Sequence, residues 1–155
     1  MARRMVANDP EKCNGCRICE FACSGKKEKA FNPVLSRIRY VQLGVVSNTT
    51  LTCRLCESPT CVRSCPRKAL SSDEKTGVIL VDDNKCSGCG WCIEACEFGA
   101  LVLHPRSKKV VVCDLCSGDP VCVECCPKKA LELRTTEEIS QKMRRAAAKK
   151  LLEEA

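Results

Sequence analysis

The chain has 155 residues, of which 17 are cysteine and only 3% are aromatic. Cysteine at about 11% of a chain indicates a fold held together at its cysteines, by disulfides, zinc or iron–sulfur clusters. The formal net charge of +7 is not accompanied by any nucleic-acid-binding motif, and no apolar run is long enough to span a membrane. We therefore expect that the protein neither binds nucleic acid nor contains a membrane-spanning segment.

The N-terminal part of the chain argues against a disulfide framework. Residues 1–10 carry charge but no apolar stretch of a signal peptide, and an odd number of cysteines would leave one thiol unpaired. We therefore expect a cytoplasmic location. The first cysteine group follows, with the spacing Cys-x2-Cys-x2-Cys-x3-Cys. After it, alternating side chains in residues 33–51, including 38–41, predict a pair of strands.

The middle of the chain holds two more cysteine groups between short apolar runs. Residues 78–81 and 100–103 predict strands on either side of the third group, and residues 110–112 predict another before the fourth. We expect a short helix to begin near the fourth cysteine of each group. The four groups are Cys13, Cys16, Cys19, Cys23; Cys53, Cys56, Cys61, Cys65; Cys86, Cys89, Cys92, Cys96; and Cys113, Cys116, Cys122, Cys126.

The spacing within these groups favours iron–sulfur clusters over zinc. Structural zinc prefers two Cys-x2-Cys pairs held a dozen or more residues apart. Here a third cysteine follows the second after only three, five or six positions. This is the pattern of bacterial ferredoxins, in which the fourth cysteine ligates a different cluster and is followed by a proline. In the second and fourth groups that proline is present, as Pro66 and Pro127. A zinc-stabilised adaptor without a redox role is the alternative from another class.

The cysteine groups belong to an internal repeat. Aligning Cys13 with Cys86, and Cys65 with Cys126, superimposes the first half of the motif region on the second. In this alignment Cys125 stands opposite Ser64, which predicts a thiol that packs near a cluster without ligating it. The alternative is an exchange of ligands between Cys125 and Cys126.

The other chemically notable side chains have structural interpretations. Trp91 is expected to cover a cluster against water, and His104, before a proline, is expected in a surface turn. Basic residues near the cysteine groups are expected to offset cluster charge. Each oxidised cluster with four thiolates carries about −2, so four clusters bring the net charge near −1. The basic residues in question are Lys26, Lys27, Lys29, Arg67, Lys68, Lys128 and Lys129.

Residues 134–155 contain no cysteine and predict a helix. Thr135 and Glu138 fit a capping box, and Ile139, Met143 and Leu151 recur at helical spacing. This helix either caps the cluster domain or reaches across to a partner subunit.

The four groups in this order, together with residues 31–38 (FNPVLSRI), resemble the four-cluster electron-transfer subunits of the dimethyl sulfoxide and nitrate reductase family. The resemblance covers about residues 5–133. It implies an α+β fold of two ferredoxin-like lobes with sparse, short strands and helices. Residues 1–50 with 108–133 would form the first lobe, residues 51–107 the second, and residues 134–155 the C-terminal helix.

The resemblance also implies which cysteines share a cluster. The first group would share two clusters with the fourth, and the second would share two with the third. The implied ligands of four [4Fe–4S] clusters are Cys13, Cys16, Cys19 and Cys126 (cluster 1); Cys113, Cys116, Cys122 and Cys23 (cluster 2); Cys53, Cys56, Cys61 and Cys96 (cluster 3); and Cys86, Cys89, Cys92 and Cys65 (cluster 4).

The implied function is electron transfer to or from a catalytic oxidoreductase subunit. The sequence has no nucleophile–base pair and no nucleotide loop, so we expect no catalysis by this chain alone. Compact relatives serve anaerobic tungsten enzymes of the aldehyde oxidoreductase type, with a flavin subunit or a ferredoxin as the other electron partner. The alternatives are a free soluble polyferredoxin, or a subunit of a carbon monoxide dehydrogenase, hydrogenase or benzoyl-CoA reductase complex.

Overall fold

Antiparallel strand pairs and short helices make up the computed structural model, which describes residues 3–44 and 47–153. The strand pairs are β1 (Arg4–Asn8) with β8 (Leu131–Thr135), β2 (Arg39–Leu43) with β3 (Ser47–Leu51), β4 (Leu70–Ser72) with β5 (Ile79–Val81), and β6 (Val102–Leu103) with β7 (Val110–Val111). The expected α+β class with short elements is confirmed.

The β1–β8 pair joins the two ends of the cysteine-containing region. Arg4 lies opposite Thr135 and Asn8 opposite Leu131. This pair was not predicted from the sequence, because residues 4–8 show no alternation of apolar and polar side chains and the partner strand lies over a hundred residues away. The hydroxyl of Thr52 donates to the carbonyl oxygen of Val6 at 3.2 Å, which ties β1 to the start of the second cysteine group.

The strands predicted within residues 33–51, 78–81, 100–103 and 110–112 are all present. The first range contains β2 and β3, and the others contain β5, β6 and β7. The two strands that flank the third cysteine group do not pair with each other. β5 pairs with β4 and β6 pairs with β7, so each hairpin connects successive cysteine groups.

The helices of the cysteine groups begin earlier than predicted. They are α1 (Ile18–Glu28), α2 (Thr60–Arg63), α3 (Trp91–Glu94) and α4 (Val121–Glu124), and two 3₁₀ turns, η1 (Pro33–Leu35) and η2 (Leu115–Gly118), accompany them. Each helix starts just before the third cysteine, so the prediction of a start near the fourth cysteine was wrong. The x3 spacing between the third and fourth cysteines is about one helical turn. In α1 both cysteines lie within the helix, whereas α2, α3 and α4 end two residues before the fourth cysteine.

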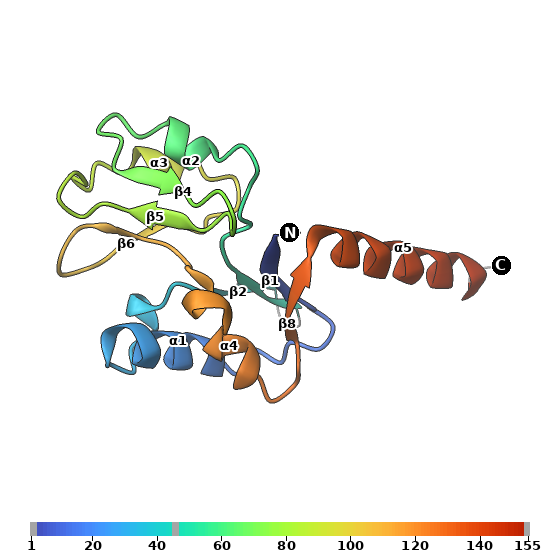
Figure 1. Ribbon diagram of the computed structural model, residues 1–155. Coiled ribbons are helices and arrows are strands. Elements are labelled where there is room, and N and C mark those ends of the chain that lie inside the picture. Colours follow the sequence, from blue (N-terminus) through green and yellow to red (C-terminus); the bar gives the residue numbers. More distant parts are fainter. Residues whose placement is uncertain (1–2, 45–46, 154–155) are drawn as a thin grey trace.

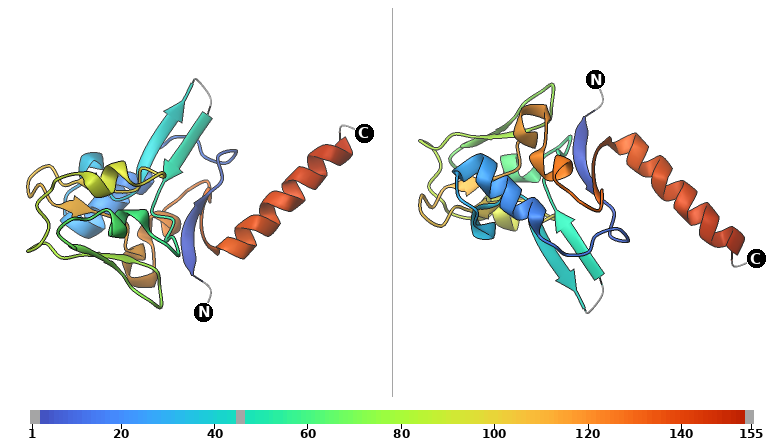
Figure 2. Two further views of the ribbon diagram at one scale, coloured as in Figure 1. Left: turned by 90° about the horizontal axis from the view of Figure 1, so that it is seen from above. Right: turned by 90° about the horizontal axis from the view of Figure 1, so that it is seen from below.

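Figure 1 shows how these elements are arranged. Helices α1 and α4 lie beside each other at one end, and α2 and α3 lie together next to β4 and β5 at the other. The β2–β3 hairpin projects from the body in Figure 2. Helix α5 (Thr136–Glu153) leaves the body beyond β8 and points away from it in both figures.

The core consists of short aliphatic side chains and cysteines. Ile38 and Leu101 are almost completely buried, and the thiols of Cys19, Cys61, Cys92 and Cys122 belong to the same buried cluster of side chains. With few aromatic side chains in the sequence, the interior is built around sulfur.

The capping box predicted for the C-terminal helix is confirmed. The N–H of Glu138 donates to the Thr135 hydroxyl oxygen at 3.2 Å, and the N–H of Thr135 donates to the Glu138 carboxylate at 2.7 Å. These two bonds satisfy backbone donors that the first turn of a helix otherwise leaves unpaired.

Candidate cluster-binding sites

Three cavities of the protein are each lined by four cysteines, three from one group and one from another. In every case the four are a set that the family resemblance implies. The cavities contain Cys13, Cys16, Cys19 and Cys126 (site 1); Cys53, Cys56, Cys61 and Cys96 (site 3); and Cys86, Cys89, Cys92 and Cys65 (site 4).

The remaining cysteines other than Cys125 meet where α1 and α4 lie side by side (Figure 1). Cys23, Cys113 and Cys122 are buried, and Cys116 is half-buried. Burial raises the pKa of the Cys122 thiol, and the neighbouring sulfurs of Cys113, Cys23 and Cys116 raise it further. We call this set site 2.

The x2 loops share one backbone feature that bends each of them sharply. The residue before the second cysteine has a positive φ in all four groups: Gly15 at 72°, Leu55 at 51°, Gly88 at 70° and Leu115 at 55°. Two groups therefore use glycine, which adopts this region freely, and two hold a buried leucine there. The positive φ reverses the direction of the chain between the first and second cysteines.

A second repeated turn places a backbone N–H on the fourth cysteine. Ala69, Ala100 and Ala130 donate their N–H groups to the sulfurs of Cys65, Cys96 and Cys126 at 3.3–3.5 Å. In the first group the turn is replaced by the continuing helix α1, and the N–H of Arg37 donates to the Cys23 sulfur at 3.3 Å instead. Hydrogen bonds to sulfur stabilise the thiolate form that an iron ligand needs.

The pKa values of the thiols show the balance between burial and hydrogen bonding. Burial raises the pKa of Cys53 to about 11 and that of Cys113 to about 12. At Cys65 burial acts in the same direction, but backbone N–H groups, that of Ala69 foremost, outweigh it and lower the pKa. The buried thiols of Cys53 and Cys113 therefore have to lose protons when they bind metal.

The arrangement of donors fits a cube of iron and sulfide better than a single zinc ion. Each site offers four thiols, which is the donor set of a [4Fe–4S] cluster. A zinc ion would draw its thiolates to about 2.3 Å from one point. Within residues 3–44 and 47–153, no three His, Cys, Asp or Glu side chains gather closely enough to hold one metal ion. A [4Fe–4S] cube holds its four cysteine ligands farther apart, because they bind at different corners of the cube.

Cys125 occupies the position that the repeat alignment gives it. Its sulfur lies 3.8 Å from the carbonyl oxygen of Cys122, and the hydroxyl of Ser64 donates to the carbonyl oxygen of Cys61 at 3.1 Å. The two side chains thus make the same contact in the two halves. Cys125 does not line the site 1 cavity, which includes its neighbour Cys126.

Two side chains differ from expectation. Trp91 is 61% exposed and is not among the residues that line the site 4 cavity. His104 lies at the β6–β7 turn, as expected, but its side chain is buried, in contact with the turn and with α1. The N–H of Ser107 donates to its Nδ1 at 3.2 Å, and its Nε2 lies 3.4 Å from the Glu28 carboxylate.

An ionic network next to site 2 includes this Glu28 carboxylate. Asp114 accepts hydrogen bonds from Lys27 at 2.7 Å and from the Arg37 guanidinium at 3.3 Å, and Arg37 also lies 3.9 Å from Glu28. Burial alone would raise the pKa of Asp114, but the two cations hold it below its usual value. The network joins α1, the residues after η1, the β6–β7 turn and the fourth cysteine group.

The four sites form a row. Three influences between thiols of different sites indicate their order: Cys19 of site 1 raises the pKa of Cys122 of site 2, Cys53 of site 3 raises that of Cys113 of site 2, and Cys61 of site 3 raises that of Cys92 of site 4. The row therefore runs from site 1 through sites 2 and 3 to site 4. The two exposed cysteines, Cys16 and Cys89, belong to sites 1 and 4 at its ends.

Comparison with known proteins agrees with the chemistry of these sites. Residues 45–137 match the model of the 4Fe-4S dicluster domain family. The polyferredoxin-like subunit of the aliphatic sulfonate oxidoreductase of Pyrococcus furiosus is 48% identical over 76% of this chain and 68% of its own length. The beta subunit of the NADH-dependent phenylglyoxylate dehydrogenase of Aromatoleum evansii is 39% identical over 86% of this chain but only 31% of its own length.

Solved structures with a similar fold include the active-site complex BamBC of benzoyl coenzyme A reductase. One chain of that complex aligns with a TM-score of 0.52 and 25% sequence identity, over 86% of this chain and 78% of its own. Among the helices in the described part of the protein, none is long and apolar enough to cross a membrane.

Proposed function

The chain belongs to the 4Fe-4S dicluster domain family of iron–sulfur electron-transfer subunits, and on this premise we propose that it conducts electrons along four [4Fe–4S] clusters to or from a catalytic oxidoreductase subunit. The observation that carries the proposal is the meeting of sixteen cysteines in four sets of four, each drawn from two groups. Sites 1 to 4 would hold clusters 1 to 4.

The protein's own residues organise the path. Each bound cluster would supply one-electron chemistry. The cysteines fix the order of the sites, the turns after the cysteine groups direct N–H groups at sulfur, and burial keeps water from sites 2 and 3. Exposure of Cys16 and Cys89 leaves the two ends of the row open to electron partners.

We assign the two ends of the row to two ferredoxin-like lobes. Residues 1–50 with 108–133 would hold clusters 1 and 2, and residues 51–107 would hold clusters 3 and 4. The β1–β8 pair and the contact between α1 and α4 support the first lobe, because they join its two distant segments. The contact between α2 and α3 supports the second.

As its catalytic partner we propose a tungsten enzyme of the aldehyde oxidoreductase type in the cytoplasm, which the family resemblance implies. Support comes from the relative in an aliphatic sulfonate oxidoreductase and from the fold shared with the benzoyl coenzyme A reductase complex. A benzoyl-CoA reductase-like partner is the second candidate. A flavin subunit or a ferredoxin would exchange electrons at the other end.

The first test is the metal content of protein purified without oxygen. We expect about sixteen iron atoms and as many acid-labile sulfides per chain, with no stoichiometric zinc. About twelve irons would mean that one site does not hold a cluster. Zinc without iron would refute the electron-transfer function.

The second test concerns the partner. An affinity-tagged chain, expressed in its own organism and purified anaerobically, should bring down a large catalytic subunit, identified by mass spectrometry and assayed for tungsten. A chain that carries its clusters but purifies alone from the native source would favour a free polyferredoxin.

A further inference from the structure

Helix α5 is long and has almost no contact with the rest of the protein. Every residue from 141 to 153 is exposed, among them Met143 at 66%, Leu151 at 70% and Leu152 at 80%. Only its first turns touch the body, where Ile139 packs against the core. Of the two alternatives predicted for this helix, a cap on the cluster domain is therefore wrong.

The sequence of α5 itself favours a helix, whereas packing against the rest of the protein contributes little to its stability. Isolated helices shorter than about 12–15 residues are marginal in water, and most helices in proteins are stabilised by packing one face. Residues 142–153 consist of strong helix formers, alanine, leucine, lysine, arginine and glutamate, together with Met143. A helix formed in advance loses little conformational entropy when a partner binds it.

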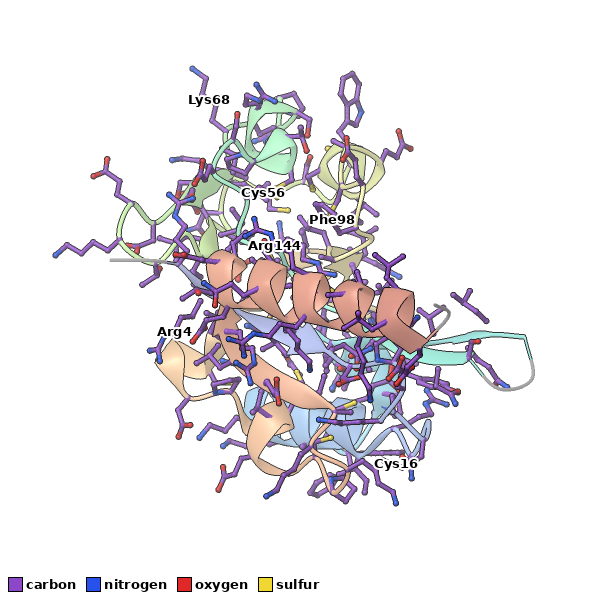
Figure 3. All side chains as sticks on the ribbon, turned by 90° about the vertical axis from the view of Figure 1, so that its right-hand side faces the viewer. Arg4, Cys16, Cys56, Lys68, Phe98 and Arg144 are labelled. Carbon is purple, nitrogen blue, oxygen red and sulfur yellow. The ribbon has the colours of Figure 1, made fainter. Side chains whose placement is uncertain are left out.

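The charge of the projecting segment indicates the kind of surface that it would meet. Residues 142–150 contain five cations and no acidic residue. Within the described residues, Lys142 pairs with Asp9 and Lys149 with Glu153, whereas Arg144 and Arg145 make no ion pair. Figure 3 shows the helix crossing in front of the body with Arg144 on it. Two guanidinium groups beside exposed apolar side chains are complementary to an apolar groove with an acidic rim.

The base of the helix is attached to site 1. Lys142 Nζ lies 2.9 Å from the carboxylate of Asp9, and the backbone carbonyl of Asp9 accepts the N–H of Cys13 at 3.2 Å. The preceding residue, Asn8, lines the site 1 cavity. A partner that holds α5 is thereby bound beside the end of the row where Cys16 is exposed.

We propose that α5 is a docking arm, which binds an acidic-rimmed apolar groove on the catalytic oxidoreductase subunit and holds that subunit next to site 1. The proposal rests on the electron-transfer function proposed above, and it names the surface and the end of the row through which the catalytic subunit is reached. Since Arg144 and Arg145 interact with acidic groups at a solvent-exposed rim, the complex should weaken as ionic strength rises.

The test uses the full-length, cluster-loaded chain and the catalytic subunit that co-purifies with it, immobilised for binding measurements. The double variant Arg144→Glu/Arg145→Glu should bind at least ten times more weakly than the native chain. The control, Lys75→Glu/Arg106→Glu, makes the same change of charge in two exposed turns and should bind normally. Deletion of residues 144–155 should weaken binding at least as much as the double reversal, independently of whether the arm folds.

Three results would overturn the proposal. One is binding of the double variant and the deletion at native strength. Another is formation of a dimer of the native chain that the double variant abolishes, measured by analytical ultracentrifugation. The third is binding of the native chain to vesicles of anionic phospholipid that depends on Arg144 and Arg145. Iron content, measured on every sample, separates the two proposals: a native chain without iron contradicts the electron-transfer function, whereas the binding constants address the arm.

Discussion

From the contact made by Cys125 we predict that this thiol is not a ligand. Its sulfur faces the carbonyl oxygen of Cys122, as the Ser64 hydroxyl faces that of Cys61. We expect Cys125→Ser to keep the full iron content and visible spectrum, because a hydroxyl can make the same contact. Cys126→Ser is the matched control and should lose about four irons, one cluster's worth. Loss of iron from the Cys125 variant would instead support an exchange of ligands between the two.

Gly88 is required at its position by space as well as by conformation. A Cβ atom there would lie 2.1 Å from the carbonyl oxygen of Lys108, a backbone atom that cannot move alone. Gly88→Ala should therefore displace the loop between Cys86 and Cys89 and reduce the iron content by about one cluster.

The variant Gly90→Ala is the control for Gly88→Ala, because it introduces backbone strain without steric overlap. Gly90 also has a positive φ, of 87°, but nothing lies within 4 Å of its added Cβ. Strain in this region costs about 1–2 kcal/mol, so the Gly90 variant should keep its iron and lose only some stability. Equal iron loss in both variants would show that backbone conformation, rather than the Lys108 carbonyl, governs this loop.

At the level of single residues, the sequence predicted the cluster ligands better than it predicted the backbone conformation and the contacts around them. Spacing alone predicted iron–sulfur ligands, and the repeat predicted the place of Cys125. It could not predict that Leu55 and Leu115 would take the conformation of Gly15 and Gly88, because leucine normally avoids it. Nor could it show that His104 is buried beside Glu28, since that contact joins segments 76 residues apart.

Among the secondary-structure elements, α5 depends most on its own sequence. Thr135→Ala removes the hydroxyl that accepts the N–H of Glu138, and loss of such a cap costs about 1 kcal/mol. We expect a measurable loss of helix by far-ultraviolet circular dichroism. Thr136→Ala, in the first turn, should leave the helix content unchanged or slightly higher. An unchanged spectrum for Thr135→Ala would mean that contacts at the base of the helix suffice without the cap.

Elements formed by local sequence were predicted well, and those formed by distant pairing were not. The β2–β3 hairpin and α5 follow from alternation and from a capping box within a few residues. β1 pairs with β8 across most of the chain, and although Leu131 and Leu133 of β8 alternate with polar residues, β1 has no such alternation. The helices of the cysteine groups were predicted with the wrong start, because each begins one residue before the third cysteine, and α2, α3 and α4 end before the fourth.

In the whole molecule, the Asp114 network joins segments from both proposed lobes. Its cations lower the pKa of Asp114 in the folded protein, so the network stabilises the fold above the ordinary carboxyl pKa of about 4 and loses this effect as the pH falls further. Asp114→Asn should cost about 1 kcal/mol at neutral pH, a modest value because the carboxylate is partly exposed.

The measurement is the rate at which urea bleaches the cluster absorbance. At neutral pH the Asp114→Asn variant should bleach about fivefold faster than the native protein, and the difference should shrink in acid, where native Asp114 takes up a proton. Asp83→Asn changes an exposed carboxylate and should bleach at the native rate. A pH-independent difference for Asp114→Asn would attribute its effect to packing or to the N–H of Cys116 that Asp114 accepts.

The row of four sites predicts that its ends and its middle differ in chemical stability. Sites 1 and 4 each contain an exposed cysteine, whereas sites 2 and 3 each have at least two buried cysteines and at most half-buried ones besides. Attack by oxidant or chelator should therefore begin at the ends. We expect controlled oxidation to release iron in two phases of about eight atoms each. The release is measured as the absorbance of an iron chelator. Cys89→Ser should remove about half of the fast phase and leave the slow phase intact, because it affects one end only. A single phase, or slow release from site 4, would mean that exposure of one ligand does not control access, and that the row lacks the protected interior that its burial pattern predicts.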